Sequence, residues 1–437
     1  MSSAQSPDKS PVRAKSLPEA APGQALRLPV RIANRSLRPW AQRLFPLSAQ
    51  ELKERVSQRT GLSVFGDEGF DAPLQNLLSL PDRADDYHPL GRYRLHHDVR
   101  RLLRTRLRLH DLIKRHPEIH NQTIDAPIFI LGLPGSGSDH LYRLLCEHPA
   151  LRCLPAWEAR EPLPRSIKAE PDLDIPERER RHRQAQRRRR LALTSPWMVQ
   201  PGATEATYGD EQELMGIEFS SLLLEMKYEN PAYRRWRMTQ PQRPAYETLR
   251  LLLQALQWLR GGERWILHSA QHIDQLEILL RVFPDARIVH VHRDPQWVCQ
   301  KTTLDVLRHR HLARGARRSP QVGQLWLDRT ESLLRSSIRT RMQFPDLPVT
   351  DIRFRDYMTD PIDIAEDCFT AFGESMPTTL RDEMKDFHAA ADHGKHDEMA
   401  TAPANHQTTR DRVEERLGFY RDFFSIAEEF PGWPESS

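Results

Sequence analysis

The sequence predicts an α/β protein with a central, mainly parallel sheet and helices on both faces. Ala126–Leu131 is a short apolar run, typical of a strand buried on both sides, and the glycine-rich segment Gly132–Gly137 and leucines at helical spacing follow it. The same order of strand and helix occurs three more times, with strands expected at Arg264–Leu267, Ala286–Val291 and Val349–Phe354. Strands that alternate with helices are typical of a parallel sheet covered on both faces.

Composition argues against several classes of protein. The chain has 437 residues, with 64 Lys and Arg against 60 Asp and Glu, so the net charge is only +4 and any affinity for anions must be local. No apolar run approaches the roughly 18 residues of a membrane span, and Met1–Pro22 lacks the apolar core of a secretory signal. The four cysteines form no C-x-x-C pair and have no zinc-ligand spacing. We therefore expect reduced thiols, no metal and a cytoplasmic protein.

Three regions are expected along the chain. Residues 1–25, rich in Ser, Ala, Pro and Lys, are interpreted as a disordered tail. A helical N-terminal region follows at 26–122, and the α/β domain extends over 123–437 with a mostly helical insertion at 158–263.

Two helices of the N-terminal region can be placed from their patterns. Ser48, with Glu51 three residues later, forms a capping box for a helix that ends at Gly61. His88–Pro117 carries leucines at helical spacing with arginines between them. This pattern favours an amphipathic helix with a solvated basic face, and nucleic-acid binding is the less favoured alternative.

A basic segment lies inside the insertion. Glu177–Arg190 has many arginines, begins with acidic residues at i,i+4 spacing and has no interleaved aromatic residues. We interpret it as a solvated helix, and the alternative is a basic lip over an anionic ligand or partner.

The glycine-rich turn after the first strand is the main candidate site. Such a turn points backbone N–H groups and the positive end of the next helix at one place, which favours an anion. A nucleoside-triphosphatase loop is excluded, because Ser138 stands at the lysine position and Asp139 at the Ser/Thr position that would hold Mg²⁺. The G-x-G-x-x-G spacing of dinucleotide-binding turns is also absent.

The turn and three later segments resemble the bacterial-type sulfotransferases that use 3′-phosphoadenosine-5′-phosphosulfate (PAPS). The family loop reads G-[LM]-P-R-[ST]-G-T-T, and this chain has Gly-Leu-Pro-Gly-Ser-Gly-Ser-Asp at 132–139. The family's other segments correspond here to Trp157-Glu158, Trp265–Ala270 and Phe283–Pro295. The resemblance implies a P-loop NTPase-like fold and transfer of a sulfuryl group from PAPS, without metal, to an acceptor hydroxyl or amine of unknown identity.

The resemblance also implies roles for particular residues. Arg293 lies at the end of a predicted strand, and its planar guanidinium would bind the 3′-phosphate of PAPS. Lys301, eight residues later, would bind the same phosphate. Glu158 would be the general base, and His268 would take the role of a family lysine. The loop residues that would hold the 5′-phosphosulfate are Pro134, Gly135, Ser136, Gly137 and Ser138.

Three departures from the family pattern leave two hypotheses open. Gly135 replaces the loop arginine, Asp139 places a carboxylate in the first helical turn, and His268 replaces a lysine. A further loop that covers the nucleotide in the family begins here as Gly394–His396 but has Glu398 in place of tyrosine. The first hypothesis is an active sulfotransferase, and the second is a catalytically inactive relative that binds an anionic ligand or a protein.

Overall fold

The computed structural model describes residues 26–79, 87–164, 185–186, 189, 208–315, 321–390 and 410–429. The expected tail, most of the basic segment Glu177–Arg190 and the segment Gly394–Glu398 lie outside the described residues.

The predicted parallel sheet is confirmed. Within the described part of the chain it has five strands in the order β2-β3-β1-β4-β5, and all four neighbouring pairs are parallel. Four of these strands correspond to the predicted ones, and the two-residue edge strand β2 was not predicted. The strands are β1 (Ile128–Leu131), β2 (Leu151–Arg152), β3 (Arg264–His268), β4 (Arg287–His292) and β5 (Val349–Arg353).

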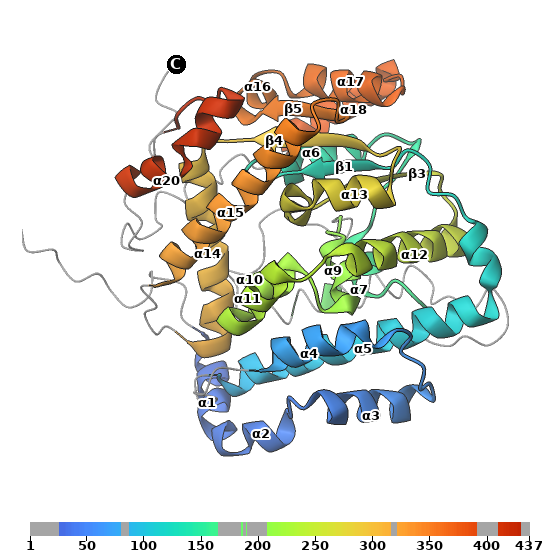
Figure 1. Cartoon of the computed structure of the whole chain (residues 1–437), viewed down its shortest axis with the longest axis vertical. Helices are drawn as coiled ribbons and strands as arrows, with labels where there is room; N and C mark the ends of the chain where they lie inside the picture. The colour runs from blue at the N-terminus through green and yellow to red at the C-terminus, as the bar shows by residue number, and fades with distance from the viewer. Residues whose placement is uncertain are drawn as a thin grey trace, which may run out of the picture.

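Helices cover both faces of the sheet, as expected (Figure 1). The side chains of β1 alternate between two apolar cores: Ile128 and Ile130 pack into one, and Phe129 and Leu131 into the other. The first core includes α6 (Ser138–Leu145), α17 (Pro361–Phe372) and α18 (Thr378–Ala390). The second includes α12 (Arg243–Arg260), α13 (Leu276–Val282), α14 (Pro295–Arg314), α15 (Gln321–Gln343) and α20 (Arg410–Phe424).

The N-terminal helices continue the second core. Leu52 and Leu103 of these helices share one apolar cluster with Phe129 of the sheet, so the boundary near residue 122 stays a prediction. The predicted N-cap and helix end are confirmed, because the Glu51 amide donates to Ser48 Oγ at 3.3 Å and Gly61 ends the helix at φ 72°. These helices are α1 (Leu28–Ser36), α2 (Ala41–Leu44), α3 (Ala49–Thr60), α4 (Asp71–Leu78) and α5 (Pro89–Arg115).

The solvated basic face expected for His88–Pro117 is wrong. In α5 the side chains of Arg101 and Arg106 are buried and form ion pairs with Glu213 and Glu218 of the insertion. Figure 1 shows the insertion helices between α5 and the sheet, and the ion pairs of Arg101 and Arg106 are made with this layer. The described helices of the insertion are α7 (Ala156–Arg160), α9 (Gln212–Met215), α10 (Leu222–Tyr228), α11 (Pro231–Thr239) and α12.

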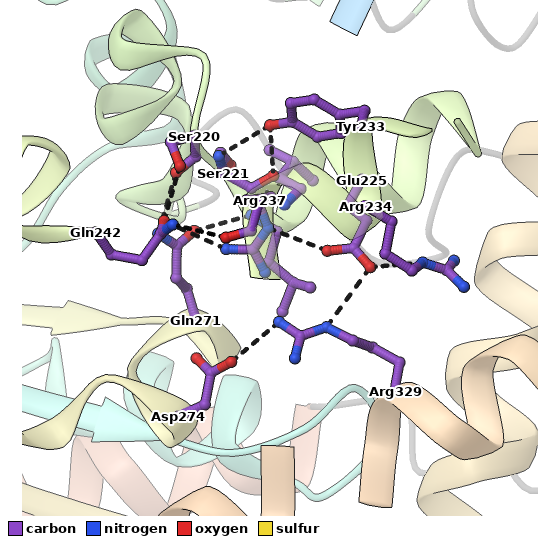
Figure 2. A network of polar contacts seen from close by, with 12 residues as sticks. Ser220, Ser221, Glu225, Tyr233, Arg234, Arg237, Gln242, Gln271, Asp274 and Arg329 are labelled. Carbon is purple, nitrogen blue, oxygen red and sulfur yellow. Dashed lines mark hydrogen bonds and ion pairs between the residues drawn. The ribbon is translucent and has the colours of Figure 1, made fainter. Parts of the chain in front are cut away.

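A buried charge cluster attaches the insertion to the α/β layers (Figure 2). The Glu225 carboxylate of α10 pairs with Arg234 at 2.8 Å, Arg237 at 3.0 Å and Arg329 of α15 at 3.5 Å. Arg329 also donates to Asp274, after β3, at 3.0 Å. Burial acts to raise the pKa of Glu225, but the three guanidinium groups outweigh it and the pKa lies below its ordinary value. The insertion is thereby held beside the carboxyl end of β3.

Candidate functional site

The glycine-rich turn joins the carboxyl end of β1 to the first residue of α6. A Cβ at Gly132 would lie 2.3 Å from Ser136 Oγ, so no larger residue fits there. Gly135 and Gly137 have φ values of 84° and 90°, a conformation that favours glycine. Among the described residues, the amides of Gly135 and Gly137 donate no hydrogen bond. These amides and the N-terminus of α6 are suited to an anion.

His268 lies next to this turn, at the end of β3. Its Nε2 atom is 2.9 Å from Ser138 Oγ, which in turn receives a hydrogen bond from Ser136 Oγ at 3.1 Å. The backbone amide of His268 donates to Glu211 Oε2 at 2.9 Å, and the Tyr142 ring stacks on the imidazole. The structure therefore brings His268 together with the predicted loop residues and fixes the orientation of its ring.

The His268 imidazole is held in its neutral form. Burial lowers its pKa below the ordinary value of 6.5, against the opposing effect of the carboxylates of Asp139 and Glu211. At neutral pH the side chain can therefore donate or accept a hydrogen bond, but it carries little of the positive charge that a lysine would bring.

Arg293 follows β4 and reaches the same turn. Its Nη1 donates to the Gly135 carbonyl oxygen at 2.7 Å. Its Cζ atom lies 3.7 Å from the ring centroid of Phe354, which follows β5, and 4.2 Å from that of Trp297. Its Nε and Nη2 donate to the carboxylate of Glu429 at 2.9 and 2.8 Å, and the guanidinium is almost completely buried. The position agrees with ligand sites of open α/β sheets, which lie at the carboxyl ends of the strands.

Lys301 packs directly against position 135. A Cβ built on Gly135 would lie 2.8 Å from Lys301 Cγ and 3.0 Å from its Cβ. The Nζ atom donates to both oxygens of Asp305, at 2.8 and 2.9 Å, and the side chain is partly exposed. The stem of Lys301 thus fills the space next to the residue where the family loop carries arginine.

The Glu158 carboxylate pairs with residues outside this group. It is only 1% exposed, and its carboxylate accepts from Arg152 of β2 at 2.9 and 3.0 Å and from Arg260 of α12 at 2.9 Å. In this arrangement the side chain joins the edge strand to the insertion. Its role as a general base stays a prediction.

Several residues of the site have no counterpart in the sequence analysis. Phe354 is the last residue of the predicted fourth strand and follows the observed one, so its place at the carboxyl edge of the sheet could have been inferred from the topology. Trp297 is in the first turn of the helix after Arg293. No pattern in the sequence indicates Glu429, which pairs with Arg293 across 136 residues of chain.

One group among the described residues has the side chains of a metal site. His290, His292 and Asp351 offer ligand atoms within 4.8 Å of one another. However, Arg341 donates to both oxygens of Asp351, at 2.9 and 2.6 Å, and His292 Nε2 is 2.9 Å from the same carboxylate. Since a cation there would face the guanidinium, we assign this group no metal.

Comparisons with known proteins agree with this geometry. A family model described as Sulfotransferase family matches residues 127–378, which include the turn, His268, Arg293 and Lys301. The structure of sulfotransferase STF9 from Mycobacterium avium superimposes with a TM-score of 0.75 at 22% identity, covering 87% of this chain and 97% of that one. For sulfotransferase STF1 from Mycobacterium tuberculosis H37Rv the TM-score is 0.71 at 23% identity, covering 85% and 98%.

Two negative results complete the comparisons. No curated protein matches the chain. Among the described residues, no helix is both long enough and apolar enough to span a bilayer.

Proposed function

Because the chain belongs to the sulfotransferase family, we propose that it binds PAPS and transfers a sulfuryl group to an acceptor hydroxyl or amine. The observation that carries this proposal is the contact between Arg293 Nη1 and the Gly135 carbonyl, at 2.7 Å, which joins two anion-binding elements at one edge of the sheet. The four free cysteines support the expected reducing compartment, the cytoplasm.

The residues at this edge fit a nucleotide that carries phosphates at the 3′ and 5′ positions of its ribose. The turn offers the amides of Gly135 and Gly137 to a 5′-phosphosulfate, while Arg293 offers a planar fork to a 3′-phosphate. A pocket of about 310 Å³ beside Arg293 is lined also by Arg353 and Phe354. PAPS, when bound, supplies a sulfuryl group whose transfer leaves adenosine 3′,5′-bisphosphate.

His268 is the base that the geometry favours. Its ring lies beside the turn, 2.9 Å from Ser138 Oγ, whereas the Glu158 carboxylate is held by Arg152 and Arg260. Because burial keeps the imidazole neutral, it can accept the proton of an acceptor hydroxyl. Lys301, whose stem lies against Gly135, is a second cation close to the position of the family's loop arginine, beside Arg293.

The pH dependence of the rate distinguishes a base from a cation at position 268. If His268 accepts a proton, kcat/KM is expected to rise with pH through a pKa below 6.5 and then to level off, since only the neutral ring is active. A cationic role would give the opposite slope. The profile is measured from about pH 5 to about pH 8 on the parent and on His268→Gln, which cannot titrate and should lose the acidic limb.

The second candidate function is an inactive relative that retains the nucleotide or protein-binding surface. It is favoured by Gly135, which supplies no side-chain cation, and by the carboxylate of Asp139 in the first turn of α6.

Product release decides between the two functions. The protein is incubated with PAPS and a panel of hydroxyl and amine acceptors, and both adenosine 3′,5′-bisphosphate and sulfated product are quantified by mass spectrometry. Acceptor-dependent formation of both, in equal amounts, is expected for the enzyme. Tight nucleotide binding with no product from any acceptor would favour the inactive relative.

A further inference from the structure

In this structure the proposed phosphate-binding arginine already holds an anion from its own chain. Nε and Nη2 of Arg293 both donate to Oε2 of Glu429, at 2.9 and 2.8 Å, and Nε also donates to Oε1 at 3.2 Å. A carboxylate and a phosphate present the same pair of oxygens to a guanidinium fork. Glu429 therefore occupies the edge of Arg293 that a 3′-phosphate would use.

The faces of the guanidinium and part of its other edge are engaged as well. Its Nη1 donates to the Gly135 carbonyl at 2.7 Å, and the rings of Phe354 and Trp297 lie against the group. A guanidinium has five N–H donors, and the contacts with Glu429 and Gly135 use that of Nε, one of Nη1 and one of Nη2. A phosphate that approaches the Nε/Nη2 edge, where both nitrogens can donate to one ligand, has to replace Glu429. The Gly135 carbonyl is part of the turn, whereas Glu429 belongs to a separate segment near the C-terminus.

That segment is attached by contacts other than its carboxylate. Residues 425–429 leave α20 through Ser425, with a φ of 52°, and the Ile426 side chain is buried in the apolar core. The backbone amide of Glu429 donates to Asp294 Oδ2 at 2.6 Å. The pocket of about 310 Å³ lies between this segment and Arg293, Arg353 and Phe354. The carboxylate can thus leave the arginine while the segment keeps its anchors.

Charge balance explains why the pair forms. Arg293 and Glu429 are 6% and 8% exposed, and an unpaired charge at such a burial is strongly disfavoured. Without nucleotide, Glu429 supplies the countercharge. With nucleotide, a carboxylate left in place would repel the 3′-phosphate.

We propose that Glu429 is an intramolecular competitor of the nucleotide, which occupies the phosphate-binding fork of Arg293 until a 3′-phosphate displaces it. The inference rests on the proposed function, since it assigns the fork to the nucleotide. It adds an autoinhibitory contact, by which the C-terminal segment sets the apparent affinity of the site.

Two charge-neutralising variants test the competition. Full-length parent, Glu429→Gln and Glu428→Gln are titrated with adenosine 3′,5′-bisphosphate at one fixed ionic strength. Glu428 is the matched control, because it is the neighbouring glutamate, is exposed and lies near Arg421 instead. Removing the competitor is expected to tighten binding about tenfold in Glu429→Gln, since a larger fraction of the protein is competent to bind, while Glu428→Gln matches the parent.

The possible results separate the inference from the function on which it rests. Equal or weaker binding by Glu429→Gln than by the parent would overturn the competition and leave the proposed function standing. No binding by the parent or by either variant would overturn the proposed function, and the inference with it.

A second measurement uses the parent protein alone. The crystal structure of the complex with adenosine 3′,5′-bisphosphate is expected to place the Glu429 carboxylate beyond hydrogen-bond distance of Arg293, while the Glu429 amide still donates to Asp294. A carboxylate that stays on Arg293 in the saturated complex would contradict the proposal even if the glutamine variant fails to fold.

Discussion

Replacing Arg293 with methionine is expected to weaken the binding of adenosine 3′,5′-bisphosphate by about 100-fold or more. Truncating one partner of a buried, hydrogen-bonded charge pair costs about 2–5 kcal/mol of binding energy, and tenfold in affinity corresponds to about 1.4 kcal/mol. Methionine retains the packing against the rings of Phe354 and Trp297 but cannot donate to a phosphate. The dissociation constant is measured by calorimetry without Mg²⁺.

Arg293→Met alone is expected to destabilise the fold, so a second substitution is combined with it. Methionine at 293 leaves the 8% exposed Glu429 carboxylate without its countercharge, which destabilises the protein by about 3–5 kcal/mol. The double variant Arg293→Met/Glu429→Gln removes both charges and is expected to unfold at a temperature close to that of the parent. Arg281→Met, which removes an exposed arginine of α13, is the matched control for the loss of one positive charge. Parent-like affinity in the folded double variant would show that Arg293 holds no part of the nucleotide.

Replacing Lys301 with methionine is expected to lower kcat about 10²–10³-fold, which is the typical loss when one group that stabilises developing charge is removed. The Lys301 stem lies against Gly135, where the family loop has an arginine, and under the proposed function its ammonium group would turn from Asp305 to the 5′-phosphosulfate. Transfer builds negative charge on the bridging oxygen of the donor, and that charge is absent in the ground state. The loss should therefore appear in kcat rather than in the affinity for adenosine 3′,5′-bisphosphate.

The two roles considered for Lys301 give different results. If Lys301 is a ligand of the 3′-phosphate, as the sequence analysis predicts, Lys301→Met should weaken nucleotide binding and change kcat less. Lys301→Arg keeps the charge and should restore most of the rate if the role is electrostatic. Asp305 still pairs with Arg308 at 3.3 Å in either variant, which limits the effect on stability. An unchanged kcat in Lys301→Met would exclude the loop-cation role.

The sheet could be predicted because its strands have strong local patterns. Ala126–Leu131 and Ala286–Val291 are apolar runs before helices, and both contain observed strands. The edge strand Leu151–Arg152 was not predicted, since two residues carry no periodicity. The burial of the arginines of α5 was also not predictable from the helix alone, because their partners Glu213 and Glu218 lie more than a hundred residues further along the chain.

Some features of the candidate site could likewise be predicted from the sequence, and others could not. The turn and Arg293 could be placed from topology, because each follows a parallel strand and these strands are neighbours. The charge of His268 depends on burial, and the contact of Lys301 with Gly135 depends on the packing of α14. Glu158 has the sequence context of a base but the surroundings of a buried ion pair. These properties arise from tertiary contacts.

The central claim is that the turn and Arg293 together bind a nucleotide with a 3′-phosphate. It is tested most directly by calorimetric titration of the parent protein, without Mg²⁺, with adenosine 3′,5′-bisphosphate and, separately, with adenosine 5′-monophosphate. The expected result is saturable one-to-one binding of the bisphosphate, at least about tenfold tighter than the monophosphate, because only the bisphosphate engages the Arg293 fork. Equal affinity for the two nucleotides, or no saturable binding of either by the folded protein, would contradict the claim.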